Sequence, residues 1–237
     1  MTSIQPYNYP GTELDLFQEA RNWKSYFAQL ISPHLGDSVL EVGAGIGGST
    51  NVLGKNNSVK RWLCLEPDQN LLSELAIKIR ELGPAFEARQ GTVNHLPDDE
   101  KFDSILYLDV LEHIEKDDAE LKLALEHLNP GGHIIILVPA HNSLFSPLDT
   151  ASGHFRRYNR NTLKRVIPSS LKQRDLLYLD SIGFFLSLAN RHLFKQTQPT
   201  KHQIKFWDNM VVPISRILDP MLHHRLGKSL LGIWQIE

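Results

Sequence analysis

The chain has 237 residues, of which 41% are hydrophobic and 22% are charged, a mixture typical of a globular protein with a substantial core. Its formal net charge of -2 shows no basic excess, so we expect no nucleic-acid partner. The longest apolar stretches, residues 134–138 and 182–188, fall far short of the ~20 residues that a membrane-spanning helix needs.

Short apolar runs alternate with amphipathic helical stretches, which favours a parallel sheet covered by helices. In the first part of the chain, the pattern predicts helices over residues 14–31, 49–53, 69–82 and 117–128, and strands over residues 38–42, 59–66, 85–91, 102–108 and 134–138. Further helices are predicted over residues 161–166, 182–194 and 204–218, and further strands over residues 176–179 and 229–236. We therefore expect an α/β fold with a doubly wound Rossmann-like sheet, mostly parallel with an antiparallel edge strand, and helices on both faces.

A glycine-rich turn follows the first predicted strand. Residues Gly43 to Gly48 match the pattern G-x-G-x-x-G between a strand and a helix. Glycine lets the backbone pass very close to a ligand, because it has no Cβ. Several nucleotide-binding folds share this pattern, so the turn predicts a nucleotide-type cofactor without naming it.

Two carboxylates near the turn narrow the choice of cofactor. Glu41 lies inside a predicted buried strand, where a charge is costly unless a cation or a hydrogen bond meets it. S-adenosylmethionine carries an ammonium and a sulfonium, whereas the pyrophosphate of a dinucleotide would be repelled. Glu66 ends the second strand, where a carboxylate can accept hydrogen bonds from both ribose hydroxyls of an adenosine, which is compatible with NAD as well. Together the two residues favour S-adenosylmethionine.

Four segments, in order, resemble the motifs of the class I S-adenosylmethionine-dependent methyltransferases. They are residues 39–47 around the glycine turn, 65–68 after the second strand, 103–114 around the fourth strand, and 128–139 leading into the fifth strand. More loosely, residues 20–23, 139–158 and 227–231 resemble a bacterial branch that often occurs alongside or fused to glycosyltransferases. The resemblance implies an enzyme that uses S-adenosylmethionine and releases S-adenosylhomocysteine.

The resemblance also implies which residues bind the cofactor. The glycine turn and the end of the fourth strand would meet its methionine part, and Glu66 its ribose. The N-terminal helix would fold over it, with Arg21 or Trp23 near the methionine carboxylate. Thr92 stands where the family usually has an acidic residue near the adenine, so its hydroxyl or the Val93 amide would substitute. The expected cofactor-binding residues are Trp23, Glu41, Gly43, Ala44, Gly45, Glu66, Pro67, Asp68, Thr92, Val93, Asp109 and Val110.

The polar segment 140–158 follows the fifth strand, at the edge where ligands bind in a doubly wound sheet. We expect His154 to be the general base, with His113 as the second candidate, because the ordinary pKa of histidine lies close to the working pH. The arginines of this segment would hold an anionic acceptor; alternatively, it is a solvated loop whose arginines pair with acidic neighbours. The expected substrate-binding residues are His113, Arg156, Arg157 and Tyr158.

Methyl transfer would be an in-line displacement at the sulfonium, catalysed mainly by positioning. A hydroxyl of a small metabolite, natural product, sugar or lipid is the first expectation for the acceptor, and a nitrogen is the second. We expect no metal, because the histidines and carboxylates show no spacing typical of zinc sites.

We expect a single methyltransferase domain over residues 1–237, as a monomer or homodimer. Residues 1–36 would form an N-terminal helical cover, 37–139 a cofactor-binding half, and 140–237 an acceptor-side half with inserted helices. The lone Cys64 in an apolar run and the absence of a signal pattern favour a cytoplasmic location, compatible with a peripheral contact with lipid. Two alternatives stay open: an NAD(P)-dependent oxidoreductase and a non-catalytic, methyltransferase-like binding subunit.

Overall fold

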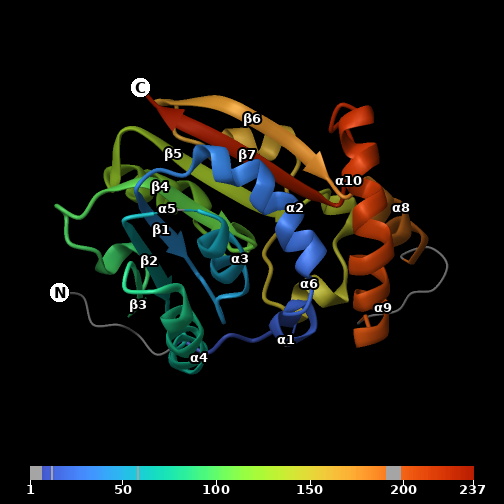
Figure 1. The fold of residues 1–237 in the computed structure, drawn as a ribbon. Helices are drawn as coiled ribbons and strands as arrows, with labels where there is room; N and C mark the ends of the chain where they lie inside the picture. Colours follow the sequence, from blue (N-terminus) through green and yellow to red (C-terminus); the bar gives the residue numbers. More distant parts are fainter. Residues whose placement is uncertain (1–6, 12, 58, 191–198) are drawn as a thin grey trace.

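The computed structural model of the chain describes residues 7–11, 13–57, 59–190 and 199–237. Within these residues, seven strands form one sheet in the order β3-β2-β1-β4-β5-β7-β6 (Figure 1). The strands are β1 (Ser38–Val42), β2 (Arg61–Glu66), β3 (Phe86–Gln90), β4 (Phe102–Leu108), β5 (Leu128–Pro139), β6 (Leu171–Leu179) and β7 (Ser229–Ile236).

Strands β1 to β5 run parallel, and β7 pairs antiparallel with both β5 and β6. At the centre, Leu40 of β1 pairs with Leu63 of β2 on one side and with Ile105 of β4 on the other. The strand order reverses between β1 and β4, and in such sheets the crevice at the carboxyl ends beside this reversal binds ligands. The predicted fold class is confirmed.

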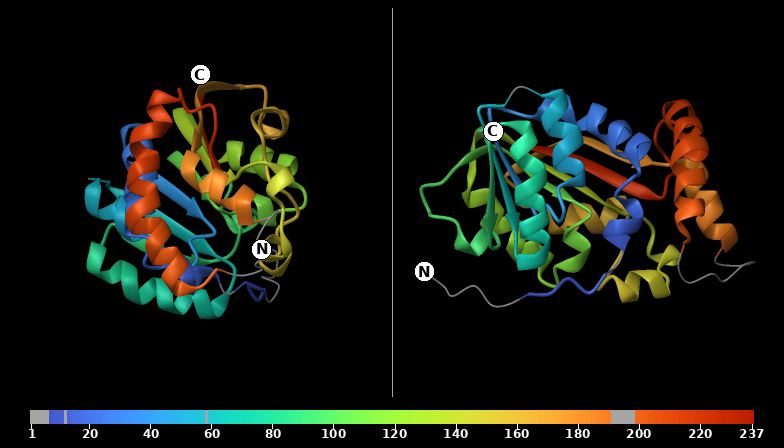
Figure 2. Two further views of the ribbon diagram at one scale, coloured as in Figure 1. Left: turned by 90° about the vertical axis from the view of Figure 1, so that its right-hand side faces the viewer. Right: turned by 60° about the horizontal axis from the view of Figure 1, so that its bottom comes forward.

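Helices cover both faces of the sheet. They are α1 (Glu13–Phe17), α2 (Arg21–Ile31), α3 (Gly48–Asn56), α4 (Gln69–Ile79), α5 (Asp117–Glu126), α6 (Pro147–Ala151), α7 (Arg160–Val166), α8 (Ser181–Ala189), α9 (Lys201–Phe206) and α10 (Val212–Met221), with a π-helical turn η7 (Trp207–Val211) between the last two. The views in Figure 2 show α8, α9 and α10 gathered at one end of the sheet.

Successive residues of the central strands face two separate cores, because side chains alternate along a strand. Val39, Trp62 and Leu106 pack on the face covered by α2, α3, α4 and α10. Leu40 and Ile105 pack on the opposite face, where α5 and α7 lie. Both faces of the parallel strands are therefore buried, and their carboxyl ends are the part left free to form a site.

The helix predicted over residues 14–31 is interrupted between α1 and α2. The cause lies far away in the sequence: the carboxylate of Asp208 accepts the N–H groups of Asn22 at 3.1 Å and Trp23 at 2.9 Å, and so caps the start of α2. Strand β5 begins at Leu128, so the Asn-Pro-Gly-Gly stretch expected to precede the strand is part of it.

Other predicted boundaries differ by a few residues. The helix predicted over residues 204–218 is a continuous run of α9, η7 and α10, and the helix predicted over 182–194 is α8 up to Ala189, with residues 191–194 outside the described part. Among the described residues, none of the helices has the length and apolar character that crossing a membrane requires. The division at residues 36 and 139 stays a prediction.

Candidate cofactor and acceptor site

A cavity of about 980 Å³ lies at the carboxyl ends of β1, β2 and β4, beside the reversal of strand order. The N-terminal segment, the glycine turn, the short helix η4 (Leu111–His113) and the segment after β5 contribute to its wall. Ligand pockets commonly measure roughly 300–1,000 Å³, so this cavity has room for a nucleoside cofactor together with a second molecule.

The glycine turn lies directly on the cavity. Gly43 and Gly45 have φ angles of +63° and +56°, in the left-handed region that favours glycine. A Cβ on Gly43 would also lie 2.9 Å from Cγ2 of Val110, which is too close. Ala44 between them donates its N–H to the carbonyl of Leu65 at 3.0 Å and so ties the turn to β2. The cavity wall includes Gly43, Ala44, Gly45 and Val110, as predicted for a backbone that approaches a ligand.

Glu66 ends β2 with its carboxylate held by backbone groups at the cavity wall. Its Oε2 accepts the N–H of Gly45 at 2.8 Å, and its Oε1 accepts the N–H of Asp68 at 2.9 Å. Burial raises the pKa of Glu66, and these two hydrogen bonds partly offset that effect. Each carboxylate oxygen can accept more than one hydrogen bond, so the side chain keeps capacity for ligand hydroxyls.

Glu41 also lines the cavity, but the protein itself meets its carboxylate. Oε2 accepts hydrogen bonds from Oγ1 of Thr50 at 2.8 Å and from Nε1 of Trp62 at 3.0 Å. Burial raises the pKa of Glu41 to about 7, against the effect of those two donors. Internal donors therefore compensate the carboxylate in part, and a contact of Glu41 with the cofactor stays a prediction.

Asp68 does not line the cavity, although we expected it to bind the cofactor. Its Oδ1 accepts the N–H groups of Asn70 at 2.7 Å and Leu71 at 3.2 Å, which caps α4. Its Oδ2 accepts the N–H of Tyr9 at 2.7 Å and so fastens the N-terminal segment. Both oxygens therefore serve the fold, as a helix cap and as an anchor of the N-terminal segment.

Only some residues of the turn after β3 line the cavity. Thr92 and Pro67 line the wall, and Oγ1 of Thr92 lies 3.1 Å from Nδ1 of His95. The side chain of Val93 instead points into the core and is fully buried, and Val93 does not line the cavity. A contact of the Val93 amide or the Thr92 hydroxyl with the adenine stays a prediction.

The start of α2 closes one side of the cavity. Trp23 lines it, as expected, and packs against Trp207 with ring centroids 5.9 Å apart. Arg21 is exposed and outside the wall, whereas Lys24 lines it. The Nζ atom of Lys24 donates to the carbonyl of Phe17 at 2.6 Å, and burial lowers the pKa of Lys24 to about 8. We did not predict Lys24, although its place one residue after Trp23 was a usable signal.

Asp109 directly follows β4 in a left-handed conformation, with φ of +55°, and opens onto the cavity. Desolvation in this enclosed position raises its pKa to about 6, against the nearby charges of His154 and Lys228. Lys228, the residue before β7, also lines the cavity and was not predicted. The resemblance of residues 227–231 to a bacterial branch gave no position for this side chain, because an antiparallel strand brings it to the cavity from the far end of the chain.

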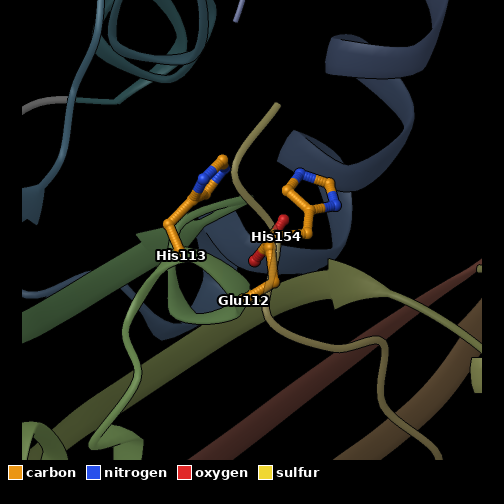
Figure 3. Close-up of side chains that lie close together, drawn as sticks. All are labelled: Glu112, His113 and His154. Carbon is orange, nitrogen blue, oxygen red and sulfur yellow. The ribbon is translucent and has the colours of Figure 1, made fainter. Parts of the chain in front are cut away.

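The two predicted bases lie together on the cavity wall, on the segments that follow β4 and β5, whereas Glu66 lies on β2, on the other side of β1. The rings of His113 and His154 meet edge to face, with centroids 4.5 Å apart (Figure 3). Nδ1 of His154 lies 2.9 Å from Oδ1 of Asp149, a carboxylate that is 1% exposed. When Nδ1–H donates to Asp149, Nε2 of His154 is the nitrogen free to accept a proton.

Arg157 completes this arrangement by donating two hydrogen bonds to Asp149, at 2.7 and 2.9 Å. Burial raises the pKa of Asp149, but the hydrogen bonds from His154 and Arg157 outweigh it and hold the pKa well below its ordinary value. Asp149 therefore stays ionised and fixes the orientation of the imidazole. Arg157 lines the cavity as expected, but as the partner of Asp149.

Arg156 and Tyr158 do not line the cavity, which contradicts their expected contact with the substrate. Nη1 of Arg156 donates to Oδ2 of Asp117 at 2.8 Å, and the hydroxyl of Tyr158 donates to the same oxygen at 2.6 Å. Tyr158 is 1% exposed. Both residues anchor the segment after β5 to α5. The pairing of Arg156 with Asp117 agrees with the alternative interpretation, in which the arginines of this segment pair with acidic neighbours.

Glu112 is a residue of the site that we missed. It is 1% exposed, and among the residues that the structure describes, no other residue hydrogen-bonds either of its carboxylate oxygens. Burial, reinforced by the charge of Asp109, raises the pKa of Glu112 well above its ordinary value. Figure 3 shows the carboxylate between the rings of His113 and His154. A glutamate inside the apolar stretch 110–114 was the signal available in the sequence.

Comparison with known proteins identifies the central part of the chain. The family model of the methyltransferase domain matches residues 40–134, which contain the glycine turn and most of the parallel sheet. An uncharacterised protein from transposon TN4556 of Streptomyces fradiae is 26% identical over 68% of this chain and 46% of its own length. Demethylmenaquinone methyltransferases of Tropheryma whipplei are 24% identical over 68% of this chain and 64% of theirs. The chain thus spans less than two thirds of the length of these relatives.

Solved structures share the fold over nearly the whole chain. A chain of the "complex between the Haloferax volcanii Trm112 methyltransferase activator and the putative methyltransferase" has a TM-score of 0.68, with 14% identity, over 95% of this chain and 94% of that one. The N-methyltransferase NodS of Bradyrhizobium japonicum, solved with S-adenosylhomocysteine, has a TM-score of 0.58, with 13% identity, and covers 95% and 91%. These findings do not favour the oxidoreductase alternative. Residues 40–134 thus match the methyltransferase domain family, and the chain has the fold of S-adenosylmethionine-dependent methyltransferases.

Proposed function

We propose that this enzyme transfers the methyl group of S-adenosylmethionine to a hydroxyl of a small-molecule acceptor, with His154 as general base. The observation that carries the proposal is the chain of hydrogen bonds from Arg157 through Asp149 to His154, on the same cavity as the glycine turn. A histidine oriented by an ionised carboxylate is suited to accept a proton from a nucleophile.

The cofactor would lie along the carboxyl ends of β1, β2 and β4. Glu66 would accept the ribose hydroxyls, since its oxygens keep unused acceptor capacity beside the cavity. The methionine part would follow the backbone of Gly43 and Gly45. Lys24 is placed to bind the methionine carboxylate, and Asp109 to attract the ammonium. Both assignments follow from opposite charges meeting in an enclosed, desolvated cavity.

The acceptor oxygen would attack the methyl carbon in line with the bond to sulfur. As the new C–O bond forms, the S–C bond breaks and its electron pair stays on sulfur, which yields S-adenosylhomocysteine. The hydroxyl proton passes to Nε2 of His154, and Asp149 stabilises the resulting imidazolium. Positioning the three reacting atoms supplies roughly 7–11 kcal/mol, and the base adds a smaller share.

An amine is the second candidate for the acceptor. The carboxylate of Glu112 has no hydrogen-bond partner from another described residue, and Asp109 lies near it. A protonated amine would meet both groups and would lose its proton to His154 before attack.

The same proposal includes three further expectations. The enzyme would be cytoplasmic, it would be a monomer or homodimer, and its partner would be a small molecule in place of a protein.

Methyl transfer is tested with S-adenosylmethionine labelled in its methyl group and a panel of acceptors. The panel holds phenols, sugar and lipid hydroxyls, amines, and a demethylmenaquinone as a carbon nucleophile. Label on a hydroxyl with the wild type, and its loss in His154→Ala at unchanged cofactor affinity, would support the proposal. Label on amines alone would replace it with the second candidate. Cofactor binding with no transfer to any acceptor would overturn both and favour the non-catalytic subunit.

A further inference from the structure

We propose that Glu112, His113 and His154 form a binding site for one divalent transition-metal ion, of the zinc class, at the acceptor end of the cavity. One donor atom from each of the three side chains can be chosen so that all lie within 4.8 Å of one another. Zinc binds imidazole nitrogen and carboxylate oxygen at about 2.0–2.2 Å. Small rotations of the two histidine side chains would therefore bring the three donors around one ion.

The strongest sign of a missing ligand is Glu112. Its side chain is 1% exposed, yet among the described residues no other residue offers a hydrogen bond to either carboxylate oxygen. Buried polar groups almost always have partners, and a buried carboxylate without one is costly. The carboxylate points between the two imidazole rings, so a cation between them would compensate it (Figure 3).

The surroundings of His154 fit a metal ligand. Metal-bound histidines usually donate their other ring N–H to a carboxylate, which fixes the tautomer and the ring orientation. Asp149 accepts such a bond from Nδ1 of His154 at 2.9 Å and is itself held by Arg157. This leaves Nε2 of His154 as the ligating atom. The same nitrogen is the proposed general base, so His154 would accept the proton only in the metal-free enzyme, and a bound ion would instead lower the pKa of the acceptor hydroxyl. Asp149 would be a positioning residue for the metal.

The donor set selects the kind of ion. Two imidazoles and one carboxylate suit zinc, cobalt or iron(II), whereas magnesium prefers oxygen ligands alone. Three protein ligands also leave an open coordination position, as in catalytic sites. That position would face the cavity, where an acceptor hydroxyl could bind and lose its proton more readily.

Sequence spacing hid this site. Glu112 and His113 are adjacent, but His154 follows 41 positions later, a separation outside the short spacings typical of zinc motifs. The segment after β5 brings the third ligand back, because the Phe155 N–H donates to the carbonyl of Glu112 at 2.9 Å. Metal binding by itself does not depend on the proposed methyl transfer; the role of the ion in activating the acceptor does.

The test uses the untagged full chain, freed of metal with EDTA and dialysed into metal-free buffer. Zn²⁺ and Mg²⁺ are titrated by calorimetry, and Co²⁺ is followed by its visible absorption. We expect one Zn²⁺ or Co²⁺ per chain and no comparable binding of Mg²⁺. Glu112→Gln and His154→Ala should each weaken Zn²⁺ binding at least roughly 10-fold, and Asp149→Asn by roughly 10–100-fold. Circular dichroism checks that each variant is folded.

The matched control is a second histidine pair, His34 and His133, whose rings lie 5.4 Å apart and which do not line the cavity. His34→Ala and His133→Ala should leave metal binding unchanged. Absence of Zn²⁺ binding, or binding that survives Glu112→Gln and His154→Ala together, would overturn the proposal. S-adenosylmethionine is titrated on the same samples, so that failure of the metal site is separated from failure of the methyltransferase function.

Discussion

The two ends of the cavity are built in different ways. At the cofactor end, the contacts come from backbone: the left-handed turn at Gly43 and Gly45, with Glu66 held by two N–H groups. At the acceptor end, side chains that are distant in sequence meet, as in the contact between the rings of His113 and His154. A site made of backbone follows from a local motif, whereas a site made of side-chain pairs depends on the tertiary fold.

The largest expected effect is a loss of catalytic rate without a loss of cofactor affinity. His154→Ala should lower kcat by roughly 10²–10⁴-fold on a hydroxyl acceptor, because the general base is lost. Its affinity for S-adenosylmethionine should stay unchanged, since the residue follows β5, on the other side of β1 from Glu66. Steady-state kinetics and calorimetry check both values, with His133→Ala as the control. An unchanged kcat would show that no base at this position contributes.

The second prediction concerns Glu41, whose folded-state pKa near 7 lies above the ordinary value of 4.5. The folded protein holds a proton that the unfolded chain releases in this window, so stability falls as pH rises from about 5 to about 7. Glu41→Gln should lack this fall and be more stable at about pH 8 by up to about 3 kcal/mol. The amide oxygen can still accept from Thr50 and Trp62.

Urea unfolding of both proteins at about pH 5.5 and about pH 8 measures this difference. Parallel pH dependence in the two proteins would contradict the account. The affinity of Glu41→Gln for S-adenosylmethionine tests whether Glu41 contacts the cofactor. An unchanged affinity would show that the internal donors compensate the carboxylate without a ligand. A large loss of affinity would confirm the direct contact that the sequence suggested.

Lys24→Ala should weaken binding of S-adenosylmethionine by about 10-fold, which corresponds to about 1.4 kcal/mol. The reason is loss of the charge proposed to meet the methionine carboxylate. An S-adenosylmethionine analogue without the carboxylate should bind the variant and the wild type equally. Arg21→Ala is the matched control, since Arg21 is exposed and outside the cavity wall. Equal losses for both ligands would instead indicate disturbed packing at the start of α2.

The smallest effect is expected for Tyr158→Phe. Loss of its hydrogen bond to Asp117 should reduce the free energy of unfolding by about 1 kcal/mol. Both kcat and KM should remain as in the wild type, because the residue anchors the segment without reaching the cavity. Denaturant unfolding and steady-state kinetics check this pair of results. A raised KM at unchanged stability would favour the substrate contact that the sequence predicted.

Sequence patterns predicted the strands and the glycine turn well because their determinants are local. Strands β4 and β7 have the predicted limits, and the turn at Gly43 lies on the cavity, since apolar runs and glycines act within a few residues. The break before α2 depends on Asp208, and Lys228 arrives with the last strand. No local pattern encodes such long-range partners. The parts of the cavity wall that depend on them could therefore be identified only from the structure.

The measurement that tests the account most directly is calorimetric titration of the protein with S-adenosylmethionine and S-adenosylhomocysteine, with NADH as the control ligand. The wild type should bind both sulfur ligands and not NADH. Glu66→Ala should lose at least roughly 10-fold in affinity, since a charged hydrogen-bond acceptor contributes about 1.5–3 kcal/mol. Asp68→Asn, which can still cap α4, should bind like the wild type. Binding of NADH in preference, or full affinity in Glu66→Ala, would contradict the placement of the cofactor.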